Sequence, residues 1–239
     1  MTDNQNAANA LLLPSGVFVS CQAPVGSPLR DPYVMVSMAR AAEKAGAVGI
    51  RAEGVDDIAQ IVQAVKVPVI GIRKQHYEGS EVYITPTRAE VDEIVGAGAS
   101  IVALDATPRP RPHGETLEAV VAHAKALGLV VMADLSSVDD AQNAIDAGVD
   151  VLGTTLVAAG PDDIRPGGPN LAVIELLAER FPGRQIIAEG RFATPDDIRG
   201  AFRAGASTVV VGKAVTDAYA LTHDLVDAAR SVSPAVRVG

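Results

Sequence analysis

The chain has few aromatic residues, a single cysteine and fewer basic than acidic residues. Only 3% of its 239 residues are aromatic, and 20 Lys and Arg stand against 29 Asp and Glu, a formal net charge of -9. Nonspecific nucleic-acid binding needs a broad basic surface, so the acidic balance excludes nucleic acid and anionic membranes as partners. The single cysteine, Cys21, excludes an intrachain disulfide framework and any multi-cysteine zinc or iron–sulfur site.

Long apolar runs are also missing. Charged residues interrupt the apolar stretches, which stay well below the ~20 residues that span a bilayer. The first ten residues are polar or small and lack the basic and apolar regions of a signal peptide. We therefore expect a protein that is not exported, and the single cysteine agrees with a reducing cytoplasm.

A phrase of Ala-Gly, a small residue and a β-branched run recurs along the chain, at 45–50, 97–104, 147–152 and 204–211. Glycine just past a helix supplies a left-handed cap, and the short apolar run indicates a strand buried on both faces. When weaker copies of this phrase are included, strands are expected at 16–21, 48–51, 68–72, 101–105, 129–133, 150–154, 185–188 and 208–211.

Eight βα units in this length predict an α/β protein, a single closed (β/α)8 TIM barrel with parallel strands, in preference to two open-sheet domains. Hydrophobic residues make up 48% of the chain, enough for a large aliphatic core. We expect the barrel to span residues 16–232, with a flexible tail at 1–15 and a second tail at 233–239. The Pro- and Gly-rich stretch Pro161–Pro169 is expected to be a loop on the barrel mouth.

Polar side chains follow the predicted strands, at the end where such barrels carry their chemistry. Seven of these residues are cationic: Arg51, Arg73, Lys74, Arg109, Arg111, Arg191 and Lys213. A local positive basin in an acidic protein suits a small anionic substrate. Taken singly, Arg109 and Arg111 are equally compatible with solvation or with pairing to nearby carboxylates. Gln22, Thr154 and Thr155 are compatible with helix capping or loop hydrogen bonds.

The last two strand ends carry a phosphate-binding pattern. Gly190 and Gly212 follow the seventh and eighth strands, where barrels often hold phosphate on backbone N–H groups, and Arg191 and Lys213 add charge. Glycines at βα turns also have a purely structural interpretation. Because no His, Cys and carboxylate cluster has metal-ligand spacing, we predict no essential metal, and we interpret Cys21 as a small core residue.

Several longer phrases are not general barrel features: Gly-Ile-Arg-Lys at 71–74, Tyr-Ile-Thr-Pro-Thr at 83–87 and Arg-Pro-Arg-Pro at 109–112. With Ala-Glu-Gly-Arg at 188–191, they make the chain from about residue 16 to 220 closely resemble the N-acetylmannosamine-6-phosphate 2-epimerases. The resemblance implies a (β/α)8 barrel without a cofactor. It implies interconversion of N-acetylmannosamine 6-phosphate and N-acetylglucosamine 6-phosphate in amino-sugar and sialic acid breakdown, and it suggests a homodimer.

The resemblance also assigns residues. It implies that Lys74 and Glu189 are catalytic and that Gly190 and Gly212 donate backbone N–H groups to phosphate. The positions that resemble the family's sugar and phosphate contacts are Gln22, Arg51, Asp105, Asp134 and Arg191. The chain departs from the pattern at Lys213, where the family usually has a small residue.

Epimerisation at carbon 2 requires removal of a proton beside the C1 carbonyl of the open-chain sugar and return of a proton to the opposite face. Lys74 can act as the base if burial beside Arg51 and Arg73 lowers its pKa, and Glu189 could protonate the other face. Arg51 or Lys74 would then stabilise the enediolate. Two other functions remain open, as do one-base and two-base routes. One is a Schiff-base aldolase or another sugar-phosphate barrel enzyme; the other is a non-catalytic sugar-phosphate-binding protein.

Overall fold

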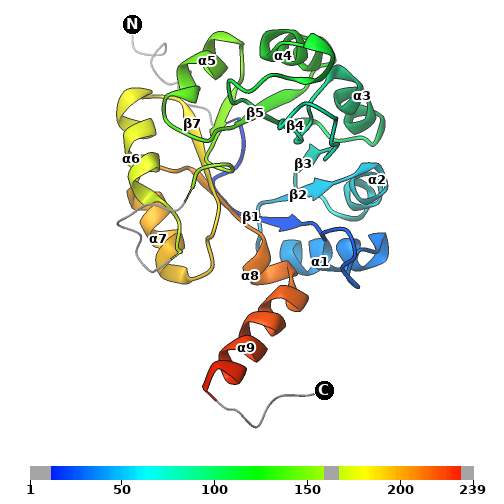
Figure 1. Cartoon of the computed structure of the whole chain (residues 1–239), viewed down its shortest axis with the longest axis vertical. Coiled ribbons are helices and arrows are strands. Elements are labelled where there is room, and N and C mark those ends of the chain that lie inside the picture. The colour runs from blue at the N-terminus through cyan, green and yellow to red at the C-terminus, as the bar shows by residue number, and fades with distance from the viewer. Residues whose placement is uncertain (1–11, 159–166, 233–239) are drawn as a thin grey trace, which may run out of the picture.

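The computed structural model describes residues 12–158 and 167–232. Eight parallel strands close into a barrel in chain order, with helices around the outside (Figure 1). The strands are β1 (Gly16–Cys21), β2 (Gly49–Glu53), β3 (Val69–Ile72), β4 (Ile101–Asp105), β5 (Val130–Asp134), β6 (Val151–Gly153), β7 (Gln185–Glu189) and β8 (Thr208–Val211). The predicted (β/α)8 barrel is confirmed, and each strand boundary lies within about two residues of its expected position.

Helices follow the strands as the alternation predicts. They are α1 (Pro32–Lys44), α2 (Val55–Ala64), α3 (Arg88–Gly96), the short 3-10 helix η2 (Pro112–Gly114), α4 (Leu117–Ala126), α5 (Asp140–Asp146), α6 (Leu171–Arg180), α7 (Pro195–Arg203), α8 (Lys213–Thr216) and α9 (Ala218–Val232). Two of them begin at a capping box, with Thr87 before α3 and Thr194 before α7. The glycines of the recurring phrase follow helices with positive φ, 97° at Gly46 and 104° at Gly205.

Side chains alternate between the two faces of each strand, and this alternation separates two cores. Residues that point outward pack against the helices. Residues that point inward form a compact apolar cluster: Phe18, Ile70, Ile72, Ile101, Ala103, Met132, Val151, Ile187 and Val210. Phe18 lies opposite Gly49 in the β1–β2 register, where an added Cβ would be 2.2 Å from the Phe18 ring. Only glycine at position 49 therefore leaves room for this ring.

The amino-terminal end of the barrel is closed by a residue that precedes β1. Leu13 is 2% exposed and belongs to the inner cluster. Its N–H donates to Oε1 of Gln185 at 3.0 Å, and its carbonyl accepts from Nε2 of the same side chain at 2.8 Å. The expected tail at 1–15 therefore needs correction, because Leu13 is part of the barrel. Residues 1–11 and 233–239, where the two tails were predicted, lie outside the described residues.

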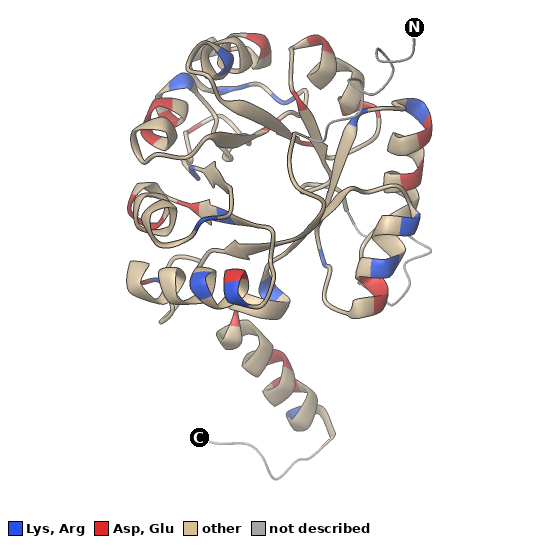
Figure 2. Ribbon diagram, turned by 180° about the vertical axis from the view of Figure 1, so that it is seen from behind, with Lys and Arg blue, Asp and Glu red and all other residues tan. Residues whose placement is uncertain are grey.

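The last helix lies apart from the others. α9 projects away from the barrel beyond the short α8 (Figure 1), and none of its residues is buried. Charged residues occur along α9 and on the outer helices, while most of the strand ribbon carries none (Figure 2). None of the helices in the described part of the chain has the length and hydropathy needed to cross a membrane.

Candidate active site

A cavity of about 270 Å³ opens at the carboxyl end of the barrel. Its lining brings together five of the predicted site residues, Gln22, Lys74, Glu189, Gly212 and Lys213. Lys74 follows β3 and Glu189 ends β7, four strands apart in a closed order of eight. The two predicted catalytic groups therefore reach the cavity from opposite walls.

The inner alternation explains why these residues meet. Ile72, Ile187 and Val210 point into the barrel. The residues two positions further along are Lys74, Glu189 and Gly212, so they occupy the next inward layer, where the barrel opens.

Lys74 is held by a short chain of hydrogen bonds. Its Nζ donates to Oε1 of Gln22 at 2.8 Å, and Nε2 of Gln22 donates to Oγ of Ser20 at 2.7 Å. Among the described residues, no carboxylate forms an ion pair with Lys74 Nζ, and the residue is partly open to solvent. The protein around the amine displaces part of its hydration water, and this desolvation lowers the pKa of Lys74. Arg51 lowers the pKa further, while the charges of Glu53 and Glu189 oppose the shift. The amine is thus suited to lose its proton.

Arg51 lies below the cavity and contacts two carboxylates. Its guanidinium makes a bidentate pair with Asp134, at 3.1 and 2.6 Å, and donates to Oε2 of Glu189 at 2.8 Å. Burial opposes the charge, but these carboxylates hold the pKa of Arg51 above its ordinary value. The side chain is 1% exposed because position 51 points into the barrel. The structure makes Arg51 the buried partner of Asp134 and Glu189, and its predicted substrate contact stays a prediction.

Among the described residues, Glu189 forms hydrogen bonds through only one of its two carboxyl oxygens. Oε2 accepts from Arg51 and lies 3.2 Å from Oγ1 of Thr155. Within the described residues, Oε1 has no protein hydrogen-bond partner. Burial raises the pKa of Glu189 to about 7, and Asp134 contributes, while Arg51, Thr155 and Lys74 act in the opposite direction. A carboxyl group with this pKa carries its proton for much of the time near neutral pH.

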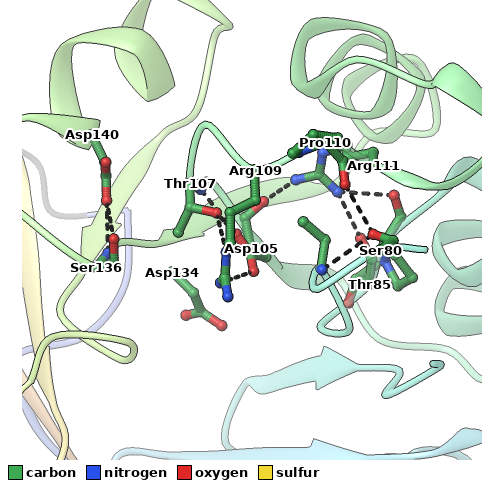
Figure 3. Close-up of polar contacts among 12 residues, drawn as sticks. Ser80, Thr85, Asp105, Thr107, Arg109, Pro110, Arg111, Asp134, Ser136 and Asp140 are labelled. Atoms are coloured by element: carbon green, nitrogen blue, oxygen red, sulfur yellow. Dashed lines mark hydrogen bonds and ion pairs between the residues drawn. The ribbon is translucent and has the colours of Figure 1, made fainter. Parts of the chain in front are cut away.

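Asp105 is bound within its own loop. Its Oδ1 accepts from the backbone N–H and the hydroxyl of Thr107, at 2.9 and 2.7 Å, and its Oδ2 pairs with Arg109 at 2.6 Å. Arg111 donates to the backbone carbonyls of Thr85, Pro86 and Asp105. Figure 3 shows these contacts clustered after β4, with Asp134 on the neighbouring strand. Asp105 is fully buried, and its hydrogen bonds fix the loop after β4; its predicted contact with the sugar stays a prediction.

The turn after β7 lies beside the cavity but does not line it among the described residues. Gly190 and Arg191 both have positive φ, 110° and 63°. Nε of Arg191 donates to the carbonyl of Gly168 at 2.7 Å, and its terminal nitrogens donate to the carbonyl of Val157 at 3.2 and 3.1 Å. Arg191 thus ties this turn to the chain on both sides of residues 159–166. These residues include most of the predicted mouth loop and lie outside the described residues.

The expected positive basin is largely neutralised by acidic partners. Arg73 pairs with Glu93 at 2.7 Å, and Lys213 pairs with Asp224 of α9 at 2.7 Å. Arg51 and Arg109 have the carboxylate partners described above. The pairing that sequence reasoning left open for Arg109 is confirmed, while Arg111 is bound by carbonyls.

Two residues at the mouth were not predicted as functional. Thr155 was interpreted as a possible cap, but its hydroxyl lies 2.6 Å from Oδ1 of Asp134 as well as near Glu189. Burial raises the pKa of Tyr83, and Asp134 and Asp105 raise it further. Its ring stacks on His76 at 5.2 Å. The inward alternation that leads from Val151 through Gly153 to position 155 is a signal that could have identified Thr155.

Cys21 is buried and unpaired in the outer core, as predicted. Among residues 12–158 and 167–232, the structure contains no group of three or more His, Cys, Asp or Glu side chains arranged to hold a metal ion.

The chain is also similar to known proteins in sequence and in structure. Over residues 35–231 the chain matches the family described as "Putative N-acetylmannosamine-6-phosphate epimerase". It is 43% identical over 212 residues to a protein of Clostridioides difficile named "Putative N-acetylmannosamine-6-phosphate 2-epimerase", covering 89% of this chain and 95% of that one. A protein of the same name from Cutibacterium acnes is 45% identical over 217 residues, with 90% and 94% coverage.

A solved structure gives the same result. The N-acetylmannosamine-6-phosphate 2-epimerase from Clostridium perfringens superposes with a TM-score of 0.83 at 38% identity, covering 89% of this chain and 92% of that one. From sequence and structure together, the chain belongs to the N-acetylmannosamine-6-phosphate epimerase family.

Proposed function

We propose that this protein is an isomerase that interconverts N-acetylmannosamine 6-phosphate and N-acetylglucosamine 6-phosphate, within amino-sugar and sialic acid breakdown. The observation that carries the proposal is the placement of Lys74 and Glu189 on opposite walls of one cavity. Inversion at one carbon is simplest with an acid-base group on each face of that carbon, and this cavity offers one group on each side. Membership in the epimerase family supports the same activity.

Lys74 acts as the base in one direction. Its neutral amine removes the proton from carbon 2 of the open-chain sugar, and the electron pair of the C–H bond moves toward the C1 carbonyl to form an enolate whose negative charge lies on O1. Gln22 accepts one N–H of the amine, which orients the nitrogen lone pair toward the cavity. The resulting ammonium then stabilises the charge on O1, a role that Arg51 cannot fill directly because it is 1% exposed.

Glu189 delivers the proton to the opposite face. Its pKa of about 7 keeps a proton available, and Oε1 is the oxygen that accepts no hydrogen bond from any described residue. In the reverse direction the roles exchange, with the Glu189 carboxylate as base and the Lys74 ammonium as acid. Arg51, held by Asp134, fixes the position of the Glu189 carboxyl group.

The phosphate group is bound at the ends of β7 and β8 in this proposal. Gly212 lines the cavity, and because glycine has no Cβ, a ligand can approach the backbone closely at this position. Backbone N–H groups at Gly190 and Gly212 are the donors, with Lys213 adding charge. Because these groups lie away from carbon 2, phosphate binding positions the sugar for both acid-base groups.

Conversion of the two sugar phosphates tests the proposal. Purified protein with N-acetylmannosamine 6-phosphate should produce N-acetylglucosamine 6-phosphate, followed by NMR, and unphosphorylated N-acetylmannosamine should react far more slowly. Borohydride added during turnover should leave the protein unmodified. A covalent adduct on Lys74 would instead support a Schiff-base aldolase, and absence of conversion would refute the epimerase activity.

The proposal also includes a homodimer in the cytoplasm. A buried lone cysteine suits a reducing compartment. α9 exposes apolar side chains, with Leu225 72% and Tyr219 58% exposed. Near it, an apolar hollow of about 460 Å³ lies between α7 and α8, lined by residues that include Ile198, Val211 and Val215. Insertion of α9 from a second copy into this region would cover both apolar surfaces.

Light scattering coupled to size exclusion tests the dimer. The wild-type chain should elute with twice the monomer mass, and Leu225→Asp should shift it toward the monomer. A monomeric wild-type protein at micromolar concentration would refute the dimer without affecting the epimerase proposal.

A further inference from the structure

We propose that Thr155 is a positioning residue whose hydroxyl group changes its hydrogen-bond acceptor from Asp134 to Glu189 when Glu189 loses its proton. Oγ1 of Thr155 lies 2.6 Å from Oδ1 of Asp134 and 3.2 Å from Oε2 of Glu189. A hydroxyl group has one hydrogen, so it can donate to one of these two carboxyl groups at a time. This inference rests on the proposed role of Glu189 as the acid.

The charges around Thr155 favour such an exchange. Three buried groups meet there, Arg51 from β2, Asp134 from β5 and Glu189 from β7, and Lys74 faces Glu189 across the cavity. With Glu189 protonated, the guanidinium and the Asp134 carboxylate cancel, and the buried cluster is neutral. When Glu189 loses its proton the cluster gains a negative charge that must be stabilised locally, because burial makes an unpartnered charge costly.

Thr155 meets this need without any movement of the backbone. In the protonated state its hydroxyl donates to Asp134 over the shorter distance. After Glu189 gives its Oε1 proton to carbon 2, the electron pair of that O–H bond remains on the carboxylate. The Thr155 hydroxyl then rotates to donate to Oε2, while Asp134 keeps both bonds from Arg51. A donor to the carboxylate form therefore appears at the moment when the charge appears.

The neighbouring threonine provides a matched contrast. Oγ1 of Thr154 donates to the carbonyl of Glu189 at 2.9 Å and accepts from its N–H at 3.0 Å. Thr154 thus fixes the main chain of Glu189, and Thr155 contacts only the carboxyl group. Removal of the Thr155 hydroxyl should leave the backbone of Glu189 in place.

The test compares Thr155→Val, which keeps the shape but loses the hydroxyl, with Thr155→Ser, which keeps it. The carboxyl pKa of Glu189 is measured by 13C NMR of glutamate-labelled protein, with Glu189→Gln to assign the signal. Thr155→Val should move the titration midpoint to higher pH, because the carboxylate loses a donor, and it should lower kcat about tenfold or more with KM unchanged within about twofold. Thr155→Ser should retain both the wild-type midpoint and kcat within about twofold.

The two readouts separate this inference from the proposed function. If the wild-type protein does not convert the sugar phosphates, the epimerase proposal fails, and the midpoint shift still tests the contact between Thr155 and Glu189. If Thr155→Val keeps the wild-type midpoint and kcat, the inference is wrong. It is also wrong if Thr155→Ser loses as much as Thr155→Val, since the hydroxyl would then not be the active feature.

Discussion

The lower and upper parts of the barrel interior are built by the same strands but have opposite character. In the lower part, Leu13, Phe18, Met132 and their neighbours form a buried apolar cluster. In the upper part, Arg51, Asp134 and Glu189 form a buried ionic cluster beneath the cavity. Apolar packing in the lower part stabilises the closed barrel. In the upper part, burial and neighbouring charges shift the pKa values of Arg51 and Glu189, which would stay near their ordinary values in water.

This contrast shows how a rigid scaffold and a reactive site can share one set of strands. Met132 belongs to the apolar cluster, and Asp134, two residues later, belongs to the ionic one. One step along the inward face therefore changes the environment from hydrocarbon to paired charges. Apolar packing in the lower part holds the strand ends in place, and the side chains of the upper part lie on or just beyond those ends.

The largest expected effect is on the upper part alone. Lys74→Ala should lower turnover by about 10² to 10⁴-fold, because the base is lost. Binding of a substrate phosphate, measured by calorimetry, should stay within about tenfold, since the phosphate is held elsewhere. The thermal unfolding midpoint should not change. A variant with near wild-type turnover would exclude Lys74 as the base.

The reverse outcome is expected for the lower part. Phe18→Ala removes a fully buried ring and should lower the free energy of unfolding by about 3 to 5 kcal/mol, measured by urea denaturation. Turnover per folded molecule should remain within about threefold of wild type, an allowance for barrier changes below about 1 kcal/mol. Loss of turnover in molecules shown to be folded would contradict the separation of the two parts.

A pH effect distinguishes the ionic cluster from the apolar one. Burial raises the pKa of Glu189 from an ordinary 4.5 to about 7, so between these values the folded protein binds this proton more tightly than the unfolded chain. The contribution of Glu189 to stability is therefore complete below about pH 4.5 and declines as the pH rises through 7, by about 3 kcal/mol in total. Glu189→Gln should remove this decline, measured as unfolding free energy at pH 5 and 8. An unchanged pH slope in the variant would show that Glu189 is not the responsible group.

The smallest effect is expected at the rim of the cavity. Gly212→Asp places a carboxylate beside the proposed phosphate site, and it should weaken substrate binding by about tenfold or more through charge repulsion. Gly212→Ala is the control for added bulk without charge. Equal affinity in the wild type and the Asp variant would show that the phosphate is not bound at the end of β8.

The barrel could be predicted from sequence because its signals are local. The Ala-Gly phrases mark helix ends, and the β-branched runs that follow mark the strands. Lys74, Glu189, Gln22 and Gly212 were noted because they lie at the ends of those runs, and the family resemblance supplied their predicted roles. The structure brings the four residues to one cavity. The end of the amino-terminal tail was misplaced because the burial of Leu13 depends on Gln185, 172 residues away.

The partners of the charged residues could not be predicted in the same way. Arg51 looks like any cation at a strand end, and only closure of the barrel shows that it meets Asp134 and Glu189. Thr155 resembles a helix cap until its distances to those carboxyl groups are known. Tyr83 reaches the mouth through a hairpin in which Ile84 pairs with Lys74, a contact without a periodic signal.

Deuterium incorporation at carbon 2 tests the central claim, that Lys74 and Glu189 handle separate protons on opposite faces. Turnover of N-acetylmannosamine 6-phosphate in deuterium oxide, followed by NMR, should place deuterium at carbon 2 of the product, because the proton delivered by Glu189 comes from solvent. Glu189→Gln should epimerise far more slowly while the starting sugar still exchanges its carbon-2 hydrogen through Lys74. Product that forms without deuterium at carbon 2, together with a fully active Glu189→Gln variant, would contradict the account.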